Sequence, residues 1–287
     1  MIVDFMIVGA QKCATTSLYA LLNRHPFIEG SSDKEPAFFA LNDDWLSKLD
    51  YYHSLFEDNS SHVKHFEAST VYTFLPLRKI GIYEKVYSYN PNMKIIYLVR
   101  DPIHRIISSY MHAYERGWEN QPIEKALILN RLYIDVSRYA TQIRPWIKRF
   151  GPESVCIVDF DDLINNTSST MEKVLHHVGV DPALYPPFDN SSSICHANKS
   201  IGGRKLRRTY TNYSKFANRF QAVSPSLLTN IVRPVWRSLA YNRARQFNAK
   251  PSLSPQMCQL IISMLDIEID CTSCLLGKDL SHWKASH

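Results

Sequence analysis

The sequence predicts an α/β fold in which a mostly parallel central sheet is covered by helices on both faces. Short apolar runs alternate with longer amphipathic stretches, as in sheets whose strands are joined by crossover helices. We expect strands at 5–9, 64–68, 94–99 and 154–159, and helices near 16–24, 102–116, 136–149, 162–178 and 255–267. With 287 residues, 45% of them hydrophobic, the chain can form one domain, 1–287, with a well-buried core.

The first strand leads into a loop that has the features of an anion site. After the apolar run 5–8, the residues Gly9-Ala10-Gln11-Lys12-Cys13-Ala14 precede Thr15-Thr16-Ser17, which open an amphipathic helix. Backbone N–H groups gather at such a helix N-terminus, where the helix dipole favours a phosphate. A nucleotide-triphosphatase loop has lysine directly after its second glycine, whereas Lys12 stands three residues after Gly9. An ordinary strand-to-helix turn is the alternative interpretation.

A candidate proton acceptor follows in the segment Lys34-Glu35-Pro36-Ala37-Phe38-Phe39, shortly after His25-Pro26. We interpret Glu35 as a carboxylate held against the apolar wall of Phe38 and Phe39, a setting that raises a carboxylate pKa and suits a general base. A solvated turn before a short helix is the alternative.

The strand at 94–99 ends in Arg100-Asp101-Pro102. Asp101 suits the N-cap of the next helix and Pro102 its first turn. Arg100 therefore stands at the carboxyl end of a strand, where open α/β sheets bind ligands, and Ser108 lies about two turns along the helix. An ion pair between Arg100 and a carboxylate is the alternative.

Together these motifs resemble those of the sulfotransferases that use 3′-phosphoadenosine 5′-phosphosulfate (PAPS), most closely the glycan-type and bacterial branches. The segment 9–18 is similar to the family's 5′-phosphosulfate loop, and Arg100 with Ser108 to its 3′-phosphate motif. His25-Pro26 and 34–39 also match, and the resemblance continues through 66–72, 137–163 and 276–283.

The resemblance implies a three-layer, P-loop-NTPase-like sulfotransferase fold and transfer of a sulfuryl group from PAPS to a hydroxyl or amine. It implies catalytic roles for Lys12, which stabilises charge on the leaving phosphate, and for Glu35 as the base; His65 and Glu67 are competing bases. Lysine and arginine would neutralise the developing charge, so we expect no metal. The implied cofactor-binding residues are Gln11, Lys12, Cys13, Ala14, Thr15, Thr16, Ser17, Arg100, Ser108, Gly203, Arg204 and Lys205.

Three positions depart from the family pattern. Ala14 stands where many members have glycine, and Gly203-Arg204-Lys205 matches the family's late glycine-arginine loop only loosely. Ala68 replaces a lysine that several glycan-modifying members carry. We therefore expect a small-molecule acceptor, such as a secondary metabolite, with a glycan acceptor as the alternative.

The segment 190–250 is strongly basic, with twelve lysines and arginines and no aspartate or glutamate. A surface of one sign faces an anion or a partner, or is simply solvated. We expect this segment to cap the cofactor and acceptor site. A nucleic-acid or other polyanion binder without catalysis, and a P-loop nucleotide kinase, are the alternative classes of protein.

No stretch approaches the roughly 18 apolar residues of a membrane span. The first strand has Asp4 in front of it and no basic segment before it. We therefore expect no signal peptide, no integral membrane segment and a cytoplasmic location. The sequence does not indicate an oligomeric state.

Overall fold

The computed structural model describes residues 2–57, 62–74, 81–186 and 250–285, which form two compact units. The described part of the first unit is 2–57, 62–74, 81–105, 132–186 and 255–285; that of the second is 106–131 and 250–254. The single domain expected over 1–287 stays a prediction. The basic segment, apart from Lys250, lies outside the described residues, and so do Gly203, Arg204 and Lys205.

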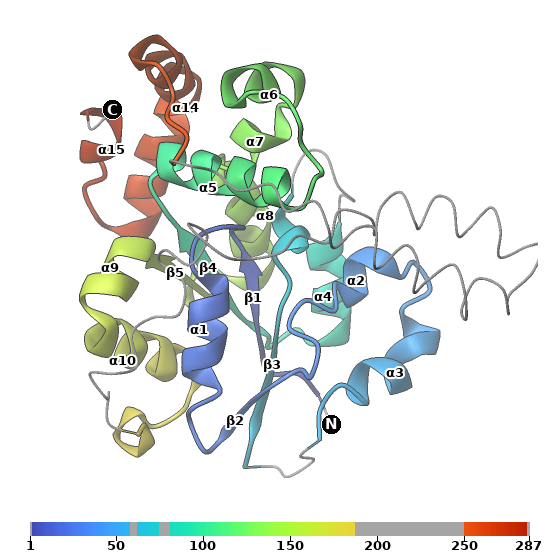
Figure 1. The fold of residues 1–287 in the computed structure, drawn as a ribbon. Coiled ribbons are helices and arrows are strands. Elements are labelled where there is room, and N and C mark those ends of the chain that lie inside the picture. The colour runs from blue at the N-terminus through green and yellow to red at the C-terminus, as the bar shows by residue number, and fades with distance from the viewer. Residues whose placement is uncertain (1, 58–61, 75–80, 187–249, 286–287) are drawn as a thin grey trace, which may run out of the picture. The chain divides into compact units, whose positions relative to one another are not determined.

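A sheet of five parallel strands forms the centre of the first unit, in the order β2-β3-β1-β4-β5 (Figure 1). The strands are β1 (Phe5–Gly9), β2 (Ile28–Gly30), β3 (Lys64–Ala68), β4 (Lys94–Val99) and β5 (Val155–Asp159). The four expected strands are all present. Strand β2 was not expected, because its three residues, Ile-Glu-Gly, contain one apolar side chain and show no periodicity.

Helices cover both faces of this sheet. Helices α1 and α10 pack on one face, and α4 and α8 lie on the other (Figure 1). In the described part of the first unit the α-helices are α1 (Thr15–Leu22), α2 (Phe38–Leu41), α3 (Leu49–His53), α4 (Ile82–Tyr89), α7 (Leu132–Asp135), α8 (Tyr139–Phe150), α9 (Phe160–Asn165), α10 (Thr167–Val178), α14 (Pro255–Leu276) and α15 (His282–Ala285). Helix α5 (Pro102–Glu115) begins in this unit and continues into the second, which also holds α6 (Ile123–Leu129).

One expected helix is in fact two. The helix predicted over 162–178 is divided into α9 and α10 at Asn166, whose φ of −129° and ψ of 48° are not helical. Asparagine competes with the helical backbone through its own side chain and favours such breaks. Helix α14 extends nine residues beyond the predicted end at 267.

The C-terminal helices complete the core of the first unit. Ile261, Leu265 and Ile269 are buried along one face of α14, which packs against α8 and β5. The fully buried Trp283 of α15 lies beside Tyr139, with 6.2 Å between the two ring centroids. Helices α14 and α15 are therefore part of the same core as the sheet.

The strand order fixes where a ligand would bind. From β1 the chain crosses to β2 on one side of the sheet, whereas β4 is followed by β5 on the other. The carboxyl ends of the neighbouring strands β1 and β4 thus form a topological switch point, the usual ligand position in open α/β sheets. The loop 10–14 follows β1 at this point, and Arg100 follows β4.

Candidate functional site

The loop 10–14 begins after a glycine that has no room for a side chain. A Cβ atom on Gly9 would lie 2.3 Å from Thr73 Oγ1 and 2.6 Å from the Tyr97 ring. The Thr73 hydroxyl is itself fixed, because it donates a hydrogen bond of 2.9 Å to the Val8 carbonyl. Glycine is therefore required where β1 passes into the loop.

The loop ends in a helix N-terminus that no side chain caps. The backbone is left-handed at Lys12, with φ of 70°, and at Ala14, with φ of 67°. Ala14 precedes α1 and makes no side-chain cap hydrogen bond. Since the first N–H groups of a helix have no acceptor within the helix, this end of α1 is suited to bind a phosphate.

The side chains expected to bind a phosphate occupy consecutive positions of this turn. Thr15 and Ser17 are buried in the first turn of α1, whereas Thr16 is exposed. Gln11 and Lys12 are partly exposed on the loop. The structure thus brings the seven expected residues 11–17 together in one strand–loop–helix junction.

Cys13 is a structural residue of the loop. Its side chain is fully buried, and its Sγ atom lies 3.8 Å from the Tyr139 hydroxyl and 3.8 Å from the Gln11 carbonyl. Burial raises the pKa of the thiol to about 11, although Arg105 opposes the shift. The side chain is therefore a neutral thiol at physiological pH and helps to pack the loop against α8.

Arg100 lies against the same loop. Its Nη1 atom donates a hydrogen bond of 3.2 Å to the Lys12 carbonyl, and its guanidinium carbon lies 4.0 Å from the centre of the Phe160 ring. The Tyr139 hydroxyl donates a hydrogen bond of 2.7 Å to the Arg100 carbonyl. Two segments 88 residues apart in the sequence are thereby joined at the switch point.

Phe160, which packs against Arg100, lies between two aspartates that pair with a lysine from the C-terminal part of the chain. It is the first residue of α9, whose N-cap Asp159 accepts a hydrogen bond of 3.2 Å from the Asp161 amide. The Lys278 ammonium lies 2.5 Å from Asp159 Oδ2 and 2.7 Å from Asp162 Oδ1. The buried Asp159 carboxylate is therefore neutralised by a lysine from the segment after α14.

The helix after Arg100 begins as the sequence predicts. Asp101 Oδ1 accepts a hydrogen bond of 2.8 Å from the His104 amide, which confirms Asp101 as the cap of α5. Ser108 lies on α5 in the second unit. Its contact with a 3′-phosphate stays a prediction.

Glu35 is not buried against an aromatic wall. Phe38 and Phe39 belong to the core, whereas 49% of the Glu35 side chain is exposed. The carboxylate pairs with the Lys34 ammonium at 2.8 Å, and the Thr70 hydroxyl lies 3.5 Å from its other oxygen. The expected burial was wrong because Pro36 and the left-handed Ala37, with φ of 51°, turn the chain between the two groups.

The competing base Glu67 is enclosed in the protein. Its side chain is fully buried at the end of β3, and its oxygens accept hydrogen bonds from three hydroxyl groups. These are the hydroxyls of Tyr52 at 3.0 Å, Tyr72 at 2.7 Å and Ser69 at 2.8 Å. Burial raises the pKa of Glu67 to about 7, against the effect of these hydrogen bonds. An acceptor molecule would have to displace them to reach the carboxylate.

His65, the other competing base, is also enclosed. Its ring is buried, with Nε2 3.3 Å from Glu29 and Nδ1 3.9 Å from Asp4, and it packs edge-on against the Phe56 ring. Of the three candidate bases, Glu35 alone is exposed at the surface, whereas the Glu67 carboxylate and the His65 ring are buried.

Sequence reasoning missed the roles of Tyr139, Phe160 and Lys278. Phe160 directly follows β5, as Arg100 follows β4, so its place after a predicted strand was a usable signal. Tyr139 and Lys278 lie within segments that carry the family resemblance, but no spacing rule relates them to Arg100.

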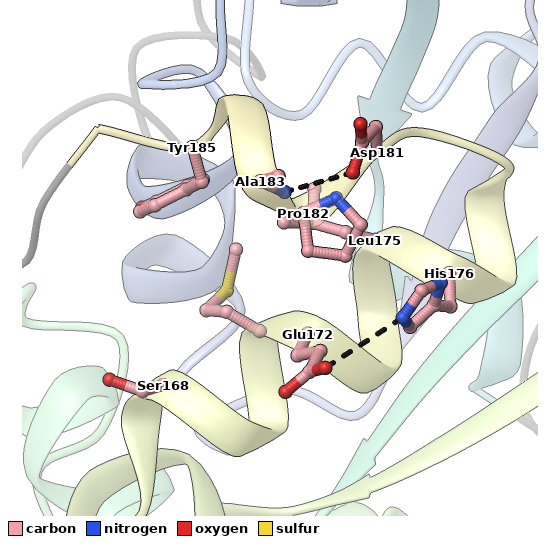
Figure 2. A pocket seen from close by; sticks show the side chains of 9 residues that line it. Ser168, Glu172, Leu175, His176, Asp181, Pro182, Ala183 and Tyr185 are labelled. Atoms are coloured by element: carbon pink, nitrogen blue, oxygen red, sulfur yellow. Dashed lines mark hydrogen bonds and ion pairs between the residues drawn. The ribbon is translucent and has the colours of Figure 1, made fainter.

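A pocket of about 440 Å³ lies elsewhere on the first unit, between α10 and the 3-10 turn Pro182–Leu184 (Figure 2). Its lining includes none of the predicted site residues. Glu172 and His176 form an ion pair of 3.8 Å across one helical turn at its edge, and both side chains are more than 60% exposed. Such a surface pair contributes little to stability.

The described residues include no cluster of three histidine, cysteine, aspartate or glutamate side chains that could hold a metal ion. None of the helices in 2–57, 62–74, 81–186 and 250–285 has the length and apolar character needed to cross a membrane.

Two curated relatives are heparan sulfate enzymes. Mouse heparan sulfate glucosamine 3-O-sulfotransferase 5 is 26% identical over 192 residues, covering 62% of this chain and 54% of the relative. Human bifunctional heparan sulfate N-deacetylase/N-sulfotransferase 2 is 25% identical over 204 residues, covering 63% of this chain and 22% of the relative. The chain thus matches about half or less of the length of these relatives.

Solved structures show the same fold. A sulfotransferase from Alicyclobacillus acidocaldarius superposes with a TM-score of 0.68 at 20% identity, and 99% of each chain is covered. A mouse sulfotransferase complexed with PAP has a TM-score of 0.53 at 16% identity, covering 99% of this chain and 89% of the other. Residues 3–196 match the sulfotransferase domain family. The chain therefore belongs to the PAPS-dependent sulfotransferase family.

Proposed function

We propose that this chain transfers a sulfuryl group from PAPS to a hydroxyl or amine of an acceptor. The observation that carries the proposal is the hydrogen bond of 3.2 Å from Arg100 to the Lys12 carbonyl. It joins a loop suited to one phosphate with a strand-end arginine suited to a second. A donor with phosphates at its 5′ and 3′ positions requires two such sites, whereas ATP has its phosphates in one chain.

The residues at the switch point fit the donor. The amides of residues 12–17, with the hydroxyls of Thr15, Thr16 and Ser17, would hold the 5′-phosphate at the start of α1. Arg100, oriented by Lys12 and Phe160, would hold the 3′-phosphate together with Ser108. When bound, PAPS supplies an activated sulfuryl group whose leaving group is a phosphate.

Lys12 and Glu35 would carry the chemistry. The acceptor oxygen or nitrogen forms a bond to sulfur while the bond from sulfur to the bridging oxygen breaks. Lys12 stabilises the negative charge that develops on that oxygen, and Glu35 takes the acceptor proton. The exposed Glu35 carboxylate is available to an acceptor, unlike the enclosed Glu67 and His65. Lys12 would also supply, at the bridging oxygen, positive charge of the kind that a metal provides in phosphoryl transfer.

For the acceptor we propose a small molecule with a hydroxyl group. The support is Ala68, a fully buried residue of β3, at the position where the family resemblance places a lysine in several glycan-modifying members. The heparan sulfate enzymes among the relatives favour a glycan as the second candidate. A turnover assay with PAPS and either 4-nitrophenol or a desulfated heparan fragment compares the two classes. A cytoplasmic location stays a prediction.

Calorimetric titration without magnesium tests the donor. We expect adenosine 3′,5′-bisphosphate (PAP) to bind at least about tenfold more tightly than ATP or AMP, and Arg100→Ala to weaken it by about a hundredfold, the value of a charge-assisted contact to phosphate. Arg149→Ala is the matched control, since Arg149 also stacks on an aromatic ring, with its guanidinium carbon 3.8 Å from the Tyr87 ring centre. Tighter binding of ATP would support the kinase alternative instead.

A second experiment tests the base. Glu35→Gln should leave the PAP affinity within twofold of the wild type and lower turnover at least about a hundredfold, because the acceptor proton has no carboxylate to receive it. Glu172→Gln, another exposed glutamate, is the control. Near-normal turnover of Glu35→Gln would remove Glu35 from the mechanism.

A further inference from the structure

The buried Glu67 carboxylate is the end point of a hydrogen-bond network that reaches the segment carrying Glu35. Its Oε1 atom accepts from the hydroxyls of Tyr52 and Tyr72, at 3.0 and 2.7 Å, and its Oε2 atom accepts from Ser69 at 2.8 Å. A fully buried carboxylate requires such donors, since it has no access to water. Two of the three donors, Ser69 and Tyr72, also form hydrogen bonds with groups other than Glu67.

Ser69 and Tyr72 connect Glu67 to backbone amides beyond Glu35. The Ala37 amide donates a hydrogen bond of 2.9 Å to Ser69 Oγ, and the Phe39 amide donates one of 3.2 Å to the Tyr72 hydroxyl. An amide can only donate, so each hydroxyl accepts from the amide and directs its own hydrogen to Glu67. Both chains of hydrogen bonds therefore run from the backbone to one carboxylate.

These two amides flank the first residue of α2 and follow a strained turn. Ala37 has a φ of 51°, a conformation that is unfavourable for a residue with a side chain and that the surroundings must maintain. Glu35 lies two residues earlier, joined to this turn by Pro36. The Glu35 carboxylate itself contacts the partly exposed Lys34 ammonium and the hydroxyl of the buried Thr70.

We propose that Glu67 is a positioning residue for sulfuryl transfer, which through Ser69 and Tyr72 holds the turn that presents Glu35 to the acceptor. The proposal rests on the proposed function in taking Glu35 as the base. It depends on the carboxylate as an acceptor at both oxygens. The substitution Glu67→Gln would keep one acceptor oxygen but would place an NH₂ group opposite a hydroxyl that also donates. One of the two hydrogen-bond chains, through Ser69 or through Tyr72, would therefore be broken.

The protonation of Glu67 would have the same effect as that substitution. Burial raises the pKa of Glu67 to about 7, Tyr72, Ser69 and Tyr52 oppose the shift, and Asp33 adds to it. Tyr89 on α4 is a further titratable neighbour, whose own pKa is raised to about 12 by burial and which is neutral throughout this range. As the pH falls through 7, Glu67 should gain a proton and so lose one acceptor position. The hydrogen bonds that hold the turn at 37–39 should then weaken.

Two tyrosines provide a matched pair of variants. Tyr52→Phe and Tyr72→Phe each remove one buried hydroxyl that donates to the same Glu67 oxygen. Of these two hydroxyls, the one of Tyr72 also accepts a hydrogen bond from the Phe39 amide. Hydrogen exchange of the peptide 34–41 then measures the turn without any cofactor. We expect Tyr72→Phe and Glu67→Gln to accelerate exchange at least about tenfold, and Tyr52→Phe to stay within threefold of the wild type. Ser69→Ala, which opens the Ala37 link, should behave as Tyr72→Phe does.

Turnover supplies the second readout. With 4-nitrophenol or the heparan fragment as acceptor, Tyr72→Phe and Glu67→Gln should lower kcat at least about tenfold with the PAP affinity within twofold, and Tyr52→Phe should be nearly normal. In the wild type, exchange at 34–41, corrected for its intrinsic pH dependence, should rise as the pH falls through 7, and Glu67→Gln should remove that dependence. Equal exchange in the two tyrosine variants would overturn the proposal. Absence of PAP binding by the wild type would overturn the proposed function alone, because the exchange comparison requires no donor.

Discussion

Two lysines of this protein have nearly the same contacts but very different carboxylate partners. Lys278 bridges Asp159 at 2.5 Å and Asp162 at 2.7 Å, and Lys284 bridges Asp266 at 2.6 Å and Asp270 at 2.7 Å. We expect Lys278→Met to destabilise the protein strongly and Lys284→Met hardly at all.

The difference in magnitude follows from burial. The Asp159 side chain is 1% exposed, so Lys278→Met would leave a buried charge without its counter-ion, which typically costs about 3–5 kcal/mol. Lys278 is itself 35% exposed, and Asp159 also accepts the Asp161 amide, so we expect about 2–3 kcal/mol. Asp266 and Asp270 are 52% and 65% exposed, and solvent would replace Lys284 at a cost below about 1 kcal/mol.

Urea unfolding followed by tryptophan fluorescence measures both changes. The double variant Lys278→Met/Asp159→Asn should recover most of the loss, because asparagine still accepts the Asp161 amide and carries no charge to bury. Equal losses for the two single lysine variants, or a double variant no more stable than Lys278→Met, would refute the reasoning from burial.

Three further predictions concern single residues of the site. Ala14→Gly should raise the free energy of unfolding by about 0.5–1 kcal/mol, since glycine adopts the φ of 67° without strain; a loss in thermal unfolding would contradict this. Cys13 should react with iodoacetamide at pH 8 at least about a hundredfold more slowly than the exposed Cys274, because burial raises its pKa to about 11; equal labelling by mass spectrometry would contradict it. Burial raises the pKa of Glu67 from 4.5 to about 7, so at a pH between these two values native Glu67 keeps a proton that the unfolded chain releases. The stability of the wild type relative to Glu67→Gln should therefore fall by about 3 kcal/mol as the pH rises through this range, and a pH-independent difference would exclude the shift.

Much of the first unit could be predicted because its strands are buried on both faces. Strands β1 and β4 have almost no exposed side chain, so each appears in the sequence as a continuous apolar run with clear ends. The loop after β1 and the arginine after β4 could then be placed at one edge of a parallel sheet. The hydrogen bond between Arg100 and the Lys12 carbonyl agrees with that placement.

The environment of Glu35 could not be predicted in the same way. Whether the Glu35 carboxylate is buried depends on the backbone angles at Pro36 and Ala37, and no periodic pattern in the sequence predicts these angles. The left-handed Ala37 sends Phe38 and Phe39 into the core and leaves Glu35 at the surface. The Glu67 network depends on hydrogen bonds from Tyr52, 15 residues before it, and from Tyr72, five residues after it, and no spacing rule predicts either contact.

The packing of α14 on α8 has a consequence for synthesis of the protein. The first unit is assembled from three separated stretches of the chain, and its buried Trp283 lies beside Tyr139. A nascent chain emerges at about 5–20 residues per second, so the sheet would leave the ribosome several seconds before α14 and α15. During that interval the face of α8 that α14 will cover is exposed to solvent and to other nascent chains. The unit can complete its core only after residue 283 has emerged.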